Sequence, residues 1–549
     1  MLKHKEYIIL GCGPAALQLG YYFQKLNNDY LILEKNDKAA SFFNKYPHSG
    51  ELISINKRFN GNDDDDFNMR HDWNSLCNDY KLRFKDFSKE YYPKSDDLVK
   101  YMNHFAEHYS LNIEFGVDIK IITKKVIHFN ELTINDDVFT LISENTIYTC
   151  KYLIVATGLS KMNIPENIEN IREYSKHYGE FEKGFFLNKD NLNYYDNKRV
   201  LIVGNGNSAF EIANLLNNHC SNIMIVGRNF PKLALISHYT GDVRTKYMNF
   251  YETFLLKSLN SFDSVGIDDY IINKTERNTF IFTNKMTQRN ELYDKEFDEI
   301  INCTGWKFNN DIFDIVVKPQ LTDNNKYPII NSDCSSVNVP NMFFIGSLMH
   351  FNDYKLSSGG FIHGFRYLID NFVKINITDF DYKTFNDITT LSDQFMKRIN
   401  TSSGLYQMYG QLCDICYFDK DKNVFVYYEQ VPINYLLSEL NTKIKIPEKT
   451  IAFMTTLEYG SDPPHEVKDV WTTKVHLGKE SHGRLLHPVL RVFRGIKLNY
   501  TNYRINYLQL NNHANMIDET HFIENIFAEF VAYGYYKERF ARIVKSYIS

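Results

Sequence analysis

Two glycine-rich turns, each between an apolar strand-like segment and a helix-like segment, constrain the fold of this chain more than any other feature. The first reads Gly-Cys-Gly-Pro-Ala-Ala at residues 11–16 and follows the apolar residues 6–10. The second reads Gly-Asn-Gly-Asn-Ser-Ala at residues 204–209 and follows residues 199–203. The glycines of such a turn bring the backbone close to a pyrophosphate, which then faces the helix N-terminus. The sequence therefore predicts two strand–turn–helix units that each bind a dinucleotide.

The first turn has the residue types that a bound dinucleotide needs. Gly11 permits the tight turn, Gly13 lets the backbone approach the phosphates, and the small Ala16 permits close packing of the helix. The next apolar segment, residues 30–33, ends at Glu34, which is suited to accept hydrogen bonds from a ribose diol. The alternative is an ordinary strand–helix–strand turn without a ligand. The acid at the end of the second strand, Glu34, argues against it.

The second turn predicts a second nucleotide site, and its expected contacts are Gly204, Gly206, Asn207, Ser208 and Ala209. After the strand at 222–226 the chain has Arg228, where the first unit has an acid. A guanidinium at this place suits a 2′-phosphate, so we expect NADPH rather than NADH, with Arg244 as a second candidate contact. The alternative is that Arg228 is a solvated loop charge.

The order of the strands predicts the division into domains. Apolar strands end in Thr-Gly at residues 157–158 and 304–305, once after each glycine-rich turn. We expect an α/β fold with two Rossmann-like dinucleotide-binding domains, in which an NADP domain is inserted into an FAD domain, and a C-terminal α+β domain without a recognisable motif. The predicted ranges are 1–160 and 336–380 for the FAD domain, 161–335 for the NADP domain and 381–549 for the C-terminal domain.

The composition excludes several classes of protein. The 549 residues include 62 Lys and Arg against 67 Asp and Glu, a net charge of −5, so nucleic-acid binding through bulk positive charge is excluded. No apolar run reaches the about 18 residues of a membrane span, and the eight cysteines are too scattered for a disulfide scaffold. The N-terminus passes directly into an apolar strand without room for a signal peptide, so we expect a cytoplasmic protein.

Six longer blocks of sequence add a family resemblance. They lie at residues 41–47, 52–58, 67–76, 91–95, 238–242 and 358–367. In these blocks the chain resembles the class B flavin-dependent monooxygenases and the wider family of flavoproteins with two dinucleotide domains. The resemblance implies FAD on the first turn, NADP on the second, and the isoalloxazine ring near the second and third blocks. The further cofactor contacts that we expect are Lys35, Phe42, Asn56, Lys57, Arg58, Asp72, Trp73, Thr157, Gly158, Gly346, Gly360 and Phe361.

Residues 70–74, Arg-His-Asp-Trp-Asn, concentrate polar and aromatic groups and form the predicted catalytic segment. In a monooxygenase, Asn74 would hydrogen-bond a flavin hydroperoxide, and Asp72 would orient Arg70 or His71. In the alternative, Trp73 is a core residue and its neighbours cap a helix that begins near Asn74.

Three other segments bear on the site. Residues 362–373 predict a helix whose N-terminal amides face the flavin and stabilise negative charge on the reduced ring. His350 and His363 either line the pocket or are hydrogen-bonded core residues, which is the more common case. The four consecutive Asp residues at 63–66 predict a solvated loop.

Cys413 and Cys416 form the only Cys-x-x-Cys pair of the chain. A structural zinc site needs four ligands, and the chain has no second Cys-x-x-Cys pair, so no metal site is predicted. The two thiols are either a redox dithiol or, as we favour, buried side chains on a helix over residues 404–417.

These observations together predict an NADPH-dependent FAD oxidoreductase, a monooxygenase that forms a C4a-hydroperoxyflavin and oxygenates a nitrogen or sulfur centre. Its partners are a small-molecule substrate and dioxygen, with no nucleic acid and no membrane span. Two alternatives stay open: a thiol-disulfide flavoenzyme, and an FAD-stabilised protein that binds partners in protein quality control, which the resemblance also suggests. The C-terminal domain would then mediate homodimer or partner contacts.

Overall fold

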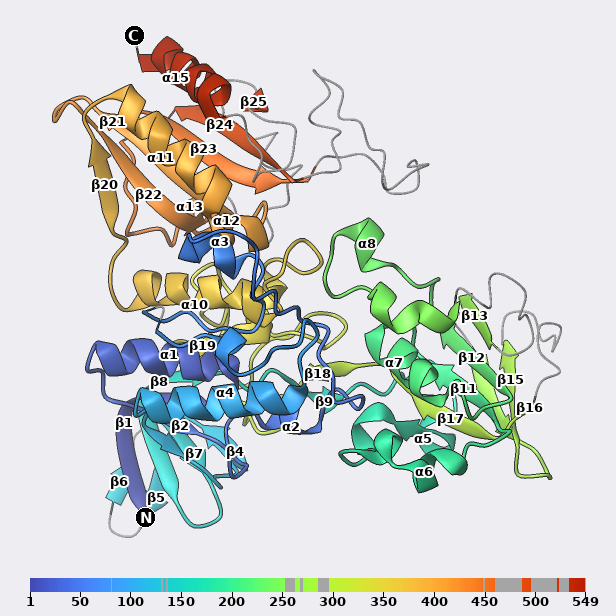
Figure 1. Ribbon diagram of the computed structural model, residues 1–549. Helices are drawn as coiled ribbons and strands as arrows, with labels where there is room; N and C mark the ends of the chain where they lie inside the picture. Colours follow the sequence, from blue (N-terminus) through green and yellow to red (C-terminus); the bar gives the residue numbers. More distant parts are fainter. Residues whose placement is uncertain are drawn as a thin grey trace.

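The computed structural model describes residues 1–79, 81–129, 132–134, 137–251, 262–266, 270–284, 296–447, 450–459, 486–494, 521–522 and 533–548 (Figure 1). The elements form three units, each built on one large sheet: the first unit at the lower left of Figure 1, the second at the right and the third at the top. The N-terminus lies in the first unit and the C-terminus in the third.

The first sheet has the strand order β3-β2-β1-β8-β7-β4, and β19 also pairs with β8. The pairs β1–β2, β2–β3, β1–β8 and β8–β19 are parallel, whereas β7 is antiparallel to both β8 and β4. Because neighbouring parallel strands share a carboxyl edge, the residues after β1, β2, β8 and β19 meet at one edge of the sheet. The strands are β1 (Leu2–Leu10), β2 (Tyr30–Leu33), β3 (Ile113–Glu114), β4 (Ile121–Thr123), β7 (Phe139–Ile142), β8 (Ile147–Val155) and β19 (Met342–Phe344).

Side chains alternate between the two faces of this sheet. On β1, Ile9 belongs to the buried cluster that includes Leu17, Phe105 and Ile369 of the covering helices, while Ile8 belongs to the cluster on the opposite face. That opposite face is covered by the segment between β18 and β19. The three covering helices are α1 (Pro14–Lys25), α4 (Ser95–His108) and α10 (Ile362–Asn376).

The second sheet has the order β10-β17-β11-β12-β13, and all its pairs are parallel. An antiparallel pair, β9 with β18, connects the first two units, because each of these strands directly follows one of the two Thr-Gly segments. The elements are β10 (Lys176–His177), β11 (Arg199–Val203), β12 (Asn222–Gly227), β13 (Phe262–Gly266), β17 (Glu299–Asn302), β9 (Leu159–Met162), β18 (Trp306–Phe308), α7 (Asn207–Leu216), and a small antiparallel sheet of β14 (Tyr270–Lys274), β15 (Phe280–Asn284) and β16 (Glu296–Phe297).

The third sheet is antiparallel, with the order β20-β22-β21-β23-β24-β25. Phe395 of α11 and Phe540 of α15 pack together against one of its faces, with ring centroids 4.1 Å apart. The elements are β20 (Tyr382–Phe385), β21 (Leu412–Asp419), β22 (Val424–Pro432), β23 (Ile451–Glu458), β24 (His487–Arg494), β25 (His521–Phe522), α11 (Ile388–Thr401), α12 (Ser403–Gln407), α13 (Ile433–Leu436) and α15 (Tyr533–Ile548).

The predicted helix over 404–417 is wrong. The helix α12 ends at Gln407, and the strand β21 begins at Leu412. This strand pairs on both sides, with β22 and β23, so the backbone hydrogen bonds of two distant segments override the local helical pattern.

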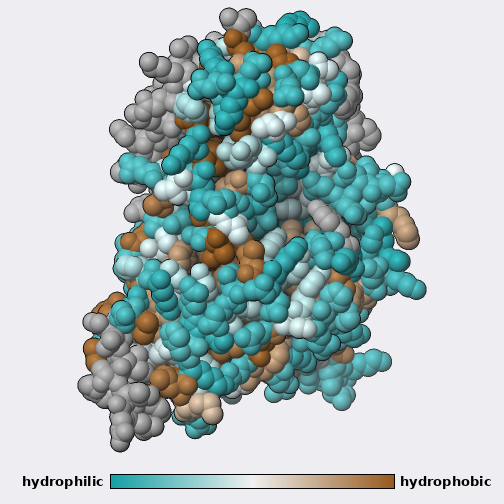
Figure 2. Space-filling model, turned by 90° about the vertical axis from the view of Figure 1, so that its left-hand side faces the viewer, coloured by the Kyte–Doolittle hydropathy of each residue, from teal (hydrophilic) through white to brown (hydrophobic). Residues whose placement is uncertain are grey.

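The remaining elements are short: α2 (Ser41–Lys45), α3 (Asp65–Met69), α5 (Ile171–Tyr174), α6 (Lys189–Asn193), α8 (Ala234–Ser237), β5 (Ile127–Phe129), β6 (Leu132–Ile134), and the 3-10 turns η1 (Phe84–Asp86), η2 (Tyr178–Glu180), η3 (Phe185–Leu187), η4 (Thr245–Met248) and η5 (Gly346–Phe351). Within the described part of the chain, no helix is long and apolar enough to cross a membrane. The face in Figure 2 is mostly hydrophilic, with apolar side chains in small groups. The predicted fold class is confirmed, whereas the exact domain boundaries stay predictions.

Candidate cofactor sites and active site

The first glycine-rich turn leaves room for an anion at the N-terminus of α1. Gly11 has φ +98°, and a Cβ there would lie 3.0 Å from the carbonyl oxygen of Ala156, at the end of β8. A Cβ on Gly13 would meet no described atom within 4 Å, and no side chain caps the helix that follows. The first-turn amides of α1 therefore point into open space, which fits the diphosphate of FAD. Ala16 is 0% exposed, as close helix packing requires.

Glu34 lies beside this turn, as the sequence predicts for a ribose-binding acid. Its Oε2 accepts a hydrogen bond from the backbone N–H of Cys12 at 2.9 Å, and its Oε1 accepts one from the amide of Asn36 at 2.6 Å. Lys35 next to it is exposed. Phe42 is 47% exposed, and its ring centroid lies 6.3 Å from that of Trp306, close to the crossing between the first two units.

The ends of β8 and β19 approach the first helix closely. Thr157 has a buried hydroxyl without a hydrogen-bond partner among the described residues, which a ligand could satisfy. Gly158 follows it with φ +61°. A Cβ on Gly346 would lie 2.6 Å from the Cβ of Ala15, so only glycine fits at this contact. All of these residues lie at the carboxyl edge of the first sheet, where Rossmann-type folds bind their ligand.

Two buried asparagines, Asn56 and Asn74, lie where residues 55–56 meet residues 72–74. Asn56 forms a bridge with Asp72, and its amide donates to the carbonyl oxygen of Ser88 at 3.0 Å. The amide of Asn74 donates to the carbonyl oxygen of Ile55 at 3.1 Å. The side-chain oxygens of both asparagines are buried without a partner in the described structure. Such acceptors are costly unless a ligand donates to them.

Asp72 holds the turn that positions Asn74. Its carboxylate accepts hydrogen bonds from the backbone N–H groups of Asn74 at 3.0 Å and Ser75 at 2.9 Å, and from the Ser75 hydroxyl. The alternative interpretation, a helix that begins near Asn74, is wrong, because this carboxylate closes a turn instead. The Arg70 guanidinium donates to the carbonyl oxygens of Ile399 and Ser402, and the orientation of Arg70 or His71 by Asp72 stays a prediction.

Lys57 and Arg58 lie at the edge of this block. Lys57 is exposed, and the guanidinium carbon of Arg58 lies 5.1 Å from the centroid of the Phe59 ring. Both side chains line a shallow pocket together with Asp72.

Trp73 belongs to an aromatic stack that connects the three segments around the expected flavin. The ring of His363 lies 4.3 Å from it at 20°, and Phe361 stacks on that histidine at 5.8 Å. On Trp73, the guanidinium carbon of Arg244 lies 5.2 Å from the ring centroid. Burial, with Arg366 and Arg244 nearby, lowers the pKa of His363 well below its ordinary value, so its ring is neutral.

The second turn repeats the geometry of the first. Gly204 has φ +109°, and a Cβ there would lie 2.4 Å from the carbonyl oxygen of Cys303. A Cβ on Gly206 would meet no described atom within 4 Å, and α7 has no side-chain cap. Ala209 is fully buried, and Ser208 is half-buried in the first turn of α7. The site therefore fits a second diphosphate.

Asn207 and Arg228 flank this second site. Asn207 donates to the carbonyl oxygen of Asp242 at 2.9 Å and accepts from the backbone N–H of Arg244 at 2.8 Å, so it holds the loop 238–244. Arg228 is exposed and forms no ion pair within the described ranges, which leaves its guanidinium available for a phosphate.

The N-terminus of α10 also lies in this region. Phe361 is its N-cap residue, and no side chain caps the helix. A Cβ on Gly360 would lie 2.9 Å from the ring of His350. The prediction that the helix amides face the flavin is consistent with this arrangement and stays a prediction, as do the assigned roles of the site residues.

The sequence analysis missed the contact that joins the third unit to the predicted catalytic segment. Asp66, predicted to be solvated, accepts hydrogen bonds from Arg398 at 3.1 Å and from the backbone N–H of Ser403 at 3.0 Å. Burial opposes the charge of Arg398, but Asp414 and its other carboxylate neighbours raise its pKa. Arg398 lies on the buried face of α11, together with Phe395 and Ile399, and a charged residue among these apolar ones is the signal that the sequence offers.

The two cysteines of the Cys-x-x-Cys pair are not arranged as a dithiol. Both are 0% exposed on β21, but Cys413 lies in one hydrophobic cluster and Cys416 in another, on opposite faces of the third sheet. Burial raises the pKa of both thiols, which keeps them protonated. The described residues contain no group of His, Cys, Asp or Glu side chains that could hold a metal ion.

Comparison with known proteins gives three findings. FAD-dependent oxidoreductase domain-containing protein 2 of Danio rerio is 30% identical over 548 residues, which are 90% of this chain and 76% of the zebrafish protein. The probable indole-3-pyruvate monooxygenase YUCCA8 of Arabidopsis thaliana is 25% identical over 230 residues, 40% of this chain and 47% of the plant protein. A mutant flavin monooxygenase from Stenotrophomonas maltophilia shares the fold, with a TM-score of 0.50 and 15% identity over 68% of this chain and 98% of that chain.

The sequence pattern of one family, described as pyridine nucleotide-disulphide oxidoreductase, matches residues 8–346. This range contains both glycine-rich turns and the segment that returns the chain to the first sheet. The chain therefore belongs to the pyridine nucleotide-disulphide oxidoreductase family and is an FAD- and NADPH-dependent oxidoreductase.

Proposed function

We propose that this oxidoreductase is a monooxygenase, which uses NADPH and dioxygen to oxygenate a nitrogen or sulfur centre of a small substrate. The observation that carries the proposal is the arrangement of the Cys-x-x-Cys thiols, which lie on opposite faces of the third sheet, away from both nucleotide turns. Electrons from NADPH then have no dithiol at Cys413 and Cys416 to reduce, and we assign dioxygen as the acceptor. The similarity to a probable plant monooxygenase adds support.

The bound flavin would supply the hydride and oxygen chemistry, and the protein would supply orientation and hydrogen bonds. We assign Asn74 a direct role, because its buried side-chain oxygen is an acceptor that a hydroxyl-bearing reactant would satisfy. Asp72 is a positioning residue, since its carboxylate holds the backbone of Asn74. A location in the cytoplasm belongs to this proposal as well.

A stopped-flow experiment tests the proposed reaction. Protein reduced with NADPH is mixed with oxygenated buffer, and the absorbance of a transient C4a-hydroperoxyflavin is followed. We expect a transient that decays within seconds and decays faster in Asn74→Leu, which has no hydrogen-bonding group. Immediate reoxidation of the wild type, with one hydrogen peroxide per NADPH and no oxygenated product, would contradict the proposal.

The thiol-disulfide alternative has a direct test. The double variant Cys413→Ser, Cys416→Ser should leave NADPH-dependent reduction of a small disulfide at the low level of the wild type. A loss of such activity in the variant would revive this alternative.

A partner-binding function is the second candidate, and one observation favours it. The family pattern ends at residue 346, whereas the similarity to the zebrafish protein extends over 90% of this chain and so includes most of the third unit. The family pattern, which contains both nucleotide turns, does not extend into this unit. A homodimer or protein complex that survives Gly206→Ala, a change in the second turn, would support a partner-binding function of the third unit.

A further inference from the structure

A chain of three buried side chains joins the second unit to the first. The hydroxyl of Tyr239 lies 2.9 Å from Nε2 of His350, and Nδ1 of the same ring lies 2.9 Å from Oδ1 of Asp353. These residues are 9%, 2% and 2% exposed. Tyr239 follows α8, and the other two residues lie in and directly after η5.

The surrounding hydrogen bonds determine the direction of this chain. The other carboxylate oxygen of Asp353 accepts from the Ser357 hydroxyl at 2.5 Å and from the backbone N–H of Gly359 at 2.8 Å. Oδ1 is therefore left to accept from Nδ1–H of His350. In this tautomer Nε2 is an acceptor, so the phenol of Tyr239 donates to it and presents its oxygen lone pairs outward.

Tyr239 lies between the elements that are expected to hold the two nucleotides. Its loop is fixed by the amide of Asn207 in the second turn, which donates to the carbonyl oxygen of Asp242. Its ring lies 6.1 Å from that of Phe361, at the N-terminus of α10. The neighbouring Thr240 has a buried hydroxyl without a partner in the described ranges, as expected beside a ligand.

The groups around Tyr239 keep it protonated. Burial is the main cause of its raised pKa, with smaller contributions from Tyr327, Tyr354, Asp353 and Asp242. Two cations lie beside these tyrosines: the Nζ of Lys326 is 5.4 Å from the Tyr327 ring centroid and 5.1 Å from that of Tyr354, and the Nζ of Lys355 is 5.4 Å from the Tyr354 centroid. A protonated phenol of this kind can accept a proton only while it passes its own proton on.

We propose that Tyr239 is the catalytic residue that takes the proton from the N–H or S–H group of the substrate, while its own proton moves to Nε2 of His350. Asp353 then holds the resulting imidazolium. The electron pair stays on the nitrogen or sulfur, which becomes the nucleophile that oxygenation requires. This inference rests on the proposed monooxygenase function.

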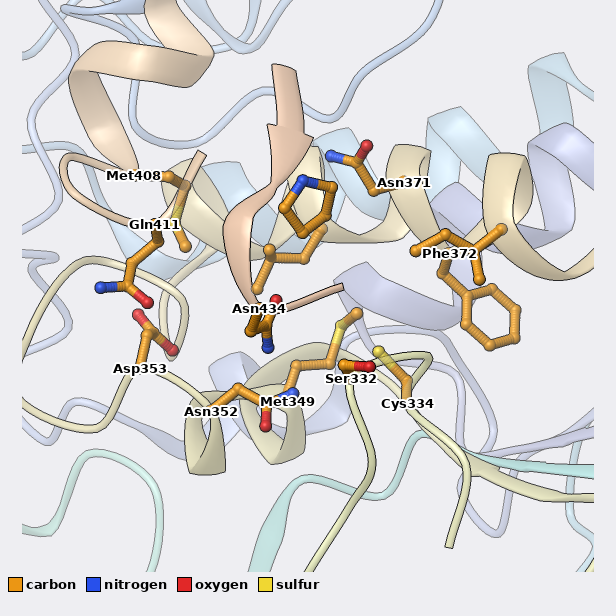
Figure 3. Close-up of a pocket in the computed structure, with 13 residues that line it drawn as sticks. Ser332, Cys334, Met349, Asn352, Asp353, Asn371, Phe372, Met408, Gln411 and Asn434 are labelled. Atoms are coloured by element: carbon orange, nitrogen blue, oxygen red, sulfur yellow. The ribbon is translucent and has the colours of Figure 1, made fainter. Parts of the chain in front are cut away.

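In this proposal the released proton leaves through the pocket that borders Asp353. Asp353 lines a pocket between η5 and the third unit, together with Asn352, Gln411 and Asn434 (Figure 3). The lining also contains apolar side chains such as Met349 and Phe372, and the polar groups near Asp353 offer a water molecule hydrogen-bond partners. The other buried histidine of the region, His363, is less suited to act as a base, because its pKa is lowered and it stacks between aromatic rings.

Two probes separate proton transfer from other effects. Benzylamine must lose a proton before it is oxygenated, whereas thioanisole has none to lose. In Tyr239→Phe we expect turnover of benzylamine at pH 7 to fall about 100-fold. This deficit should shrink at higher pH. Turnover of thioanisole and reduction of the flavin by NADPH should change little. His350→Gln should give the same pattern. Tyr22→Phe is the control, because it removes a half-buried phenol that donates to Asp370 instead.

A second readout does not depend on turnover. In protein labelled with ¹⁵N-histidine, benzylamine should convert His350 to imidazolium in the wild type and leave it neutral in Tyr239→Phe, and thioanisole should have no effect in either. The inference is overturned if Tyr239→Phe slows the turnover of both probes equally or of neither. It is also overturned if benzylamine leaves His350 neutral in the wild type. If the wild type oxygenates neither probe but benzylamine still protonates His350, the proposed function fails and the proton transfer stands.

Discussion

Arg398 donates a hydrogen bond at 3.1 Å to the carboxylate of Asp66, 332 positions earlier in the chain. The guanidinium also donates to Asp414 at 2.8 Å within its own unit. A single side chain thus connects the core of the third unit to the helix that directly precedes the predicted catalytic segment. The third unit is therefore part of the support of the site.

Asp66→Asn should destabilise this contact without altering the cores of the units. The amide has the shape of the carboxylate but no charge, so the hydrogen bonds to Arg398 and Ser403 weaken by about 1–3 kcal/mol in total. We expect a lower urea midpoint and faster proteolysis between the units. Asp63→Asn, at an exposed residue of the same run, is the matched control and should have no effect. Equal midpoints for the two variants would contradict the anchoring role.

Gly13→Ala should separate folding from cofactor binding. Gly13 has φ −82° and ψ −178°, which alanine adopts easily, and its Cβ would meet no described atom. The variant should fold with an unchanged melting temperature but bind FAD at least about tenfold more weakly, because the methyl group occupies the place of the diphosphate. Gly206→Ala should keep FAD and lose affinity for NADPH. Gly11→Ala, at φ +98°, should lose stability itself. FAD content of purified protein and differential scanning calorimetry measure both effects.

Arg228→Gln should change the preference between the two nicotinamide cofactors. Loss of a charge-assisted contact to the 2′-phosphate costs about 1.5–3 kcal/mol, so the KM for NADPH should rise about 10- to 100-fold. The KM for NADH, which has no such phosphate, should stay constant. Steady-state oxidation of both cofactors measures the ratio, and a parallel rise for NADPH and NADH would refute the assignment.

Alkaline pH should destabilise the folded chain. Burial raises the pKa of the thiols of Cys77 and Cys220 to about 12 and also raises that of the fully buried Cys413 and Cys416. Unfolded thiols lose their protons from about pH 8.5 upward, whereas these folded ones keep theirs. The unfolded state then binds fewer protons, and the free energy of unfolding falls with rising pH by up to about 1.4 kcal/mol per pH unit for each such thiol.

Thermal melts from pH 7 to pH 10.5 measure this decline. The variant Cys413→Ala, Cys416→Ala should start from a lower melting temperature but decline less steeply, because two of the responsible groups are absent. A pH-independent wild-type melting temperature over this range would contradict the prediction.

The geometry of the glycine-rich turns could be predicted from the sequence because its determinants are local, whereas the nucleotide contacts of single residues stay predictions. Gly11, Gly13 and Glu34 lie within one strand–helix–strand unit, and the residue types at these places follow from the geometry of a tight turn. The strand at Cys413 and Cys416 could not be predicted, because its partners β22 and β23 supply the hydrogen bonds that make it a strand. The same holds for contacts between remote residues, which leave no pattern in any short window.

Tyr239 and His350 are such a remote pair, 111 positions apart. The sequence marks the block around Tyr239 as part of a family resemblance, and His350 as a residue that either lines the pocket or lies in the core. Neither observation indicates that their side chains meet. That contact depends on how the second unit packs against the first.

Asn207 belongs to the turn that is expected to bind NADPH, yet its side chain holds the loop that brings Tyr239 to His350 and Arg244 to Trp73. If the two turns hold their nucleotides as proposed, both nucleotides lie against this loop. The free energy of the state with both nucleotides bound does not depend on which nucleotide binds first. If NADPH strengthens FAD binding through this loop by some factor, FAD must therefore strengthen NADPH binding by the same factor. A substitution in residues 238–244 would then shift both affinities, even where it touches neither nucleotide.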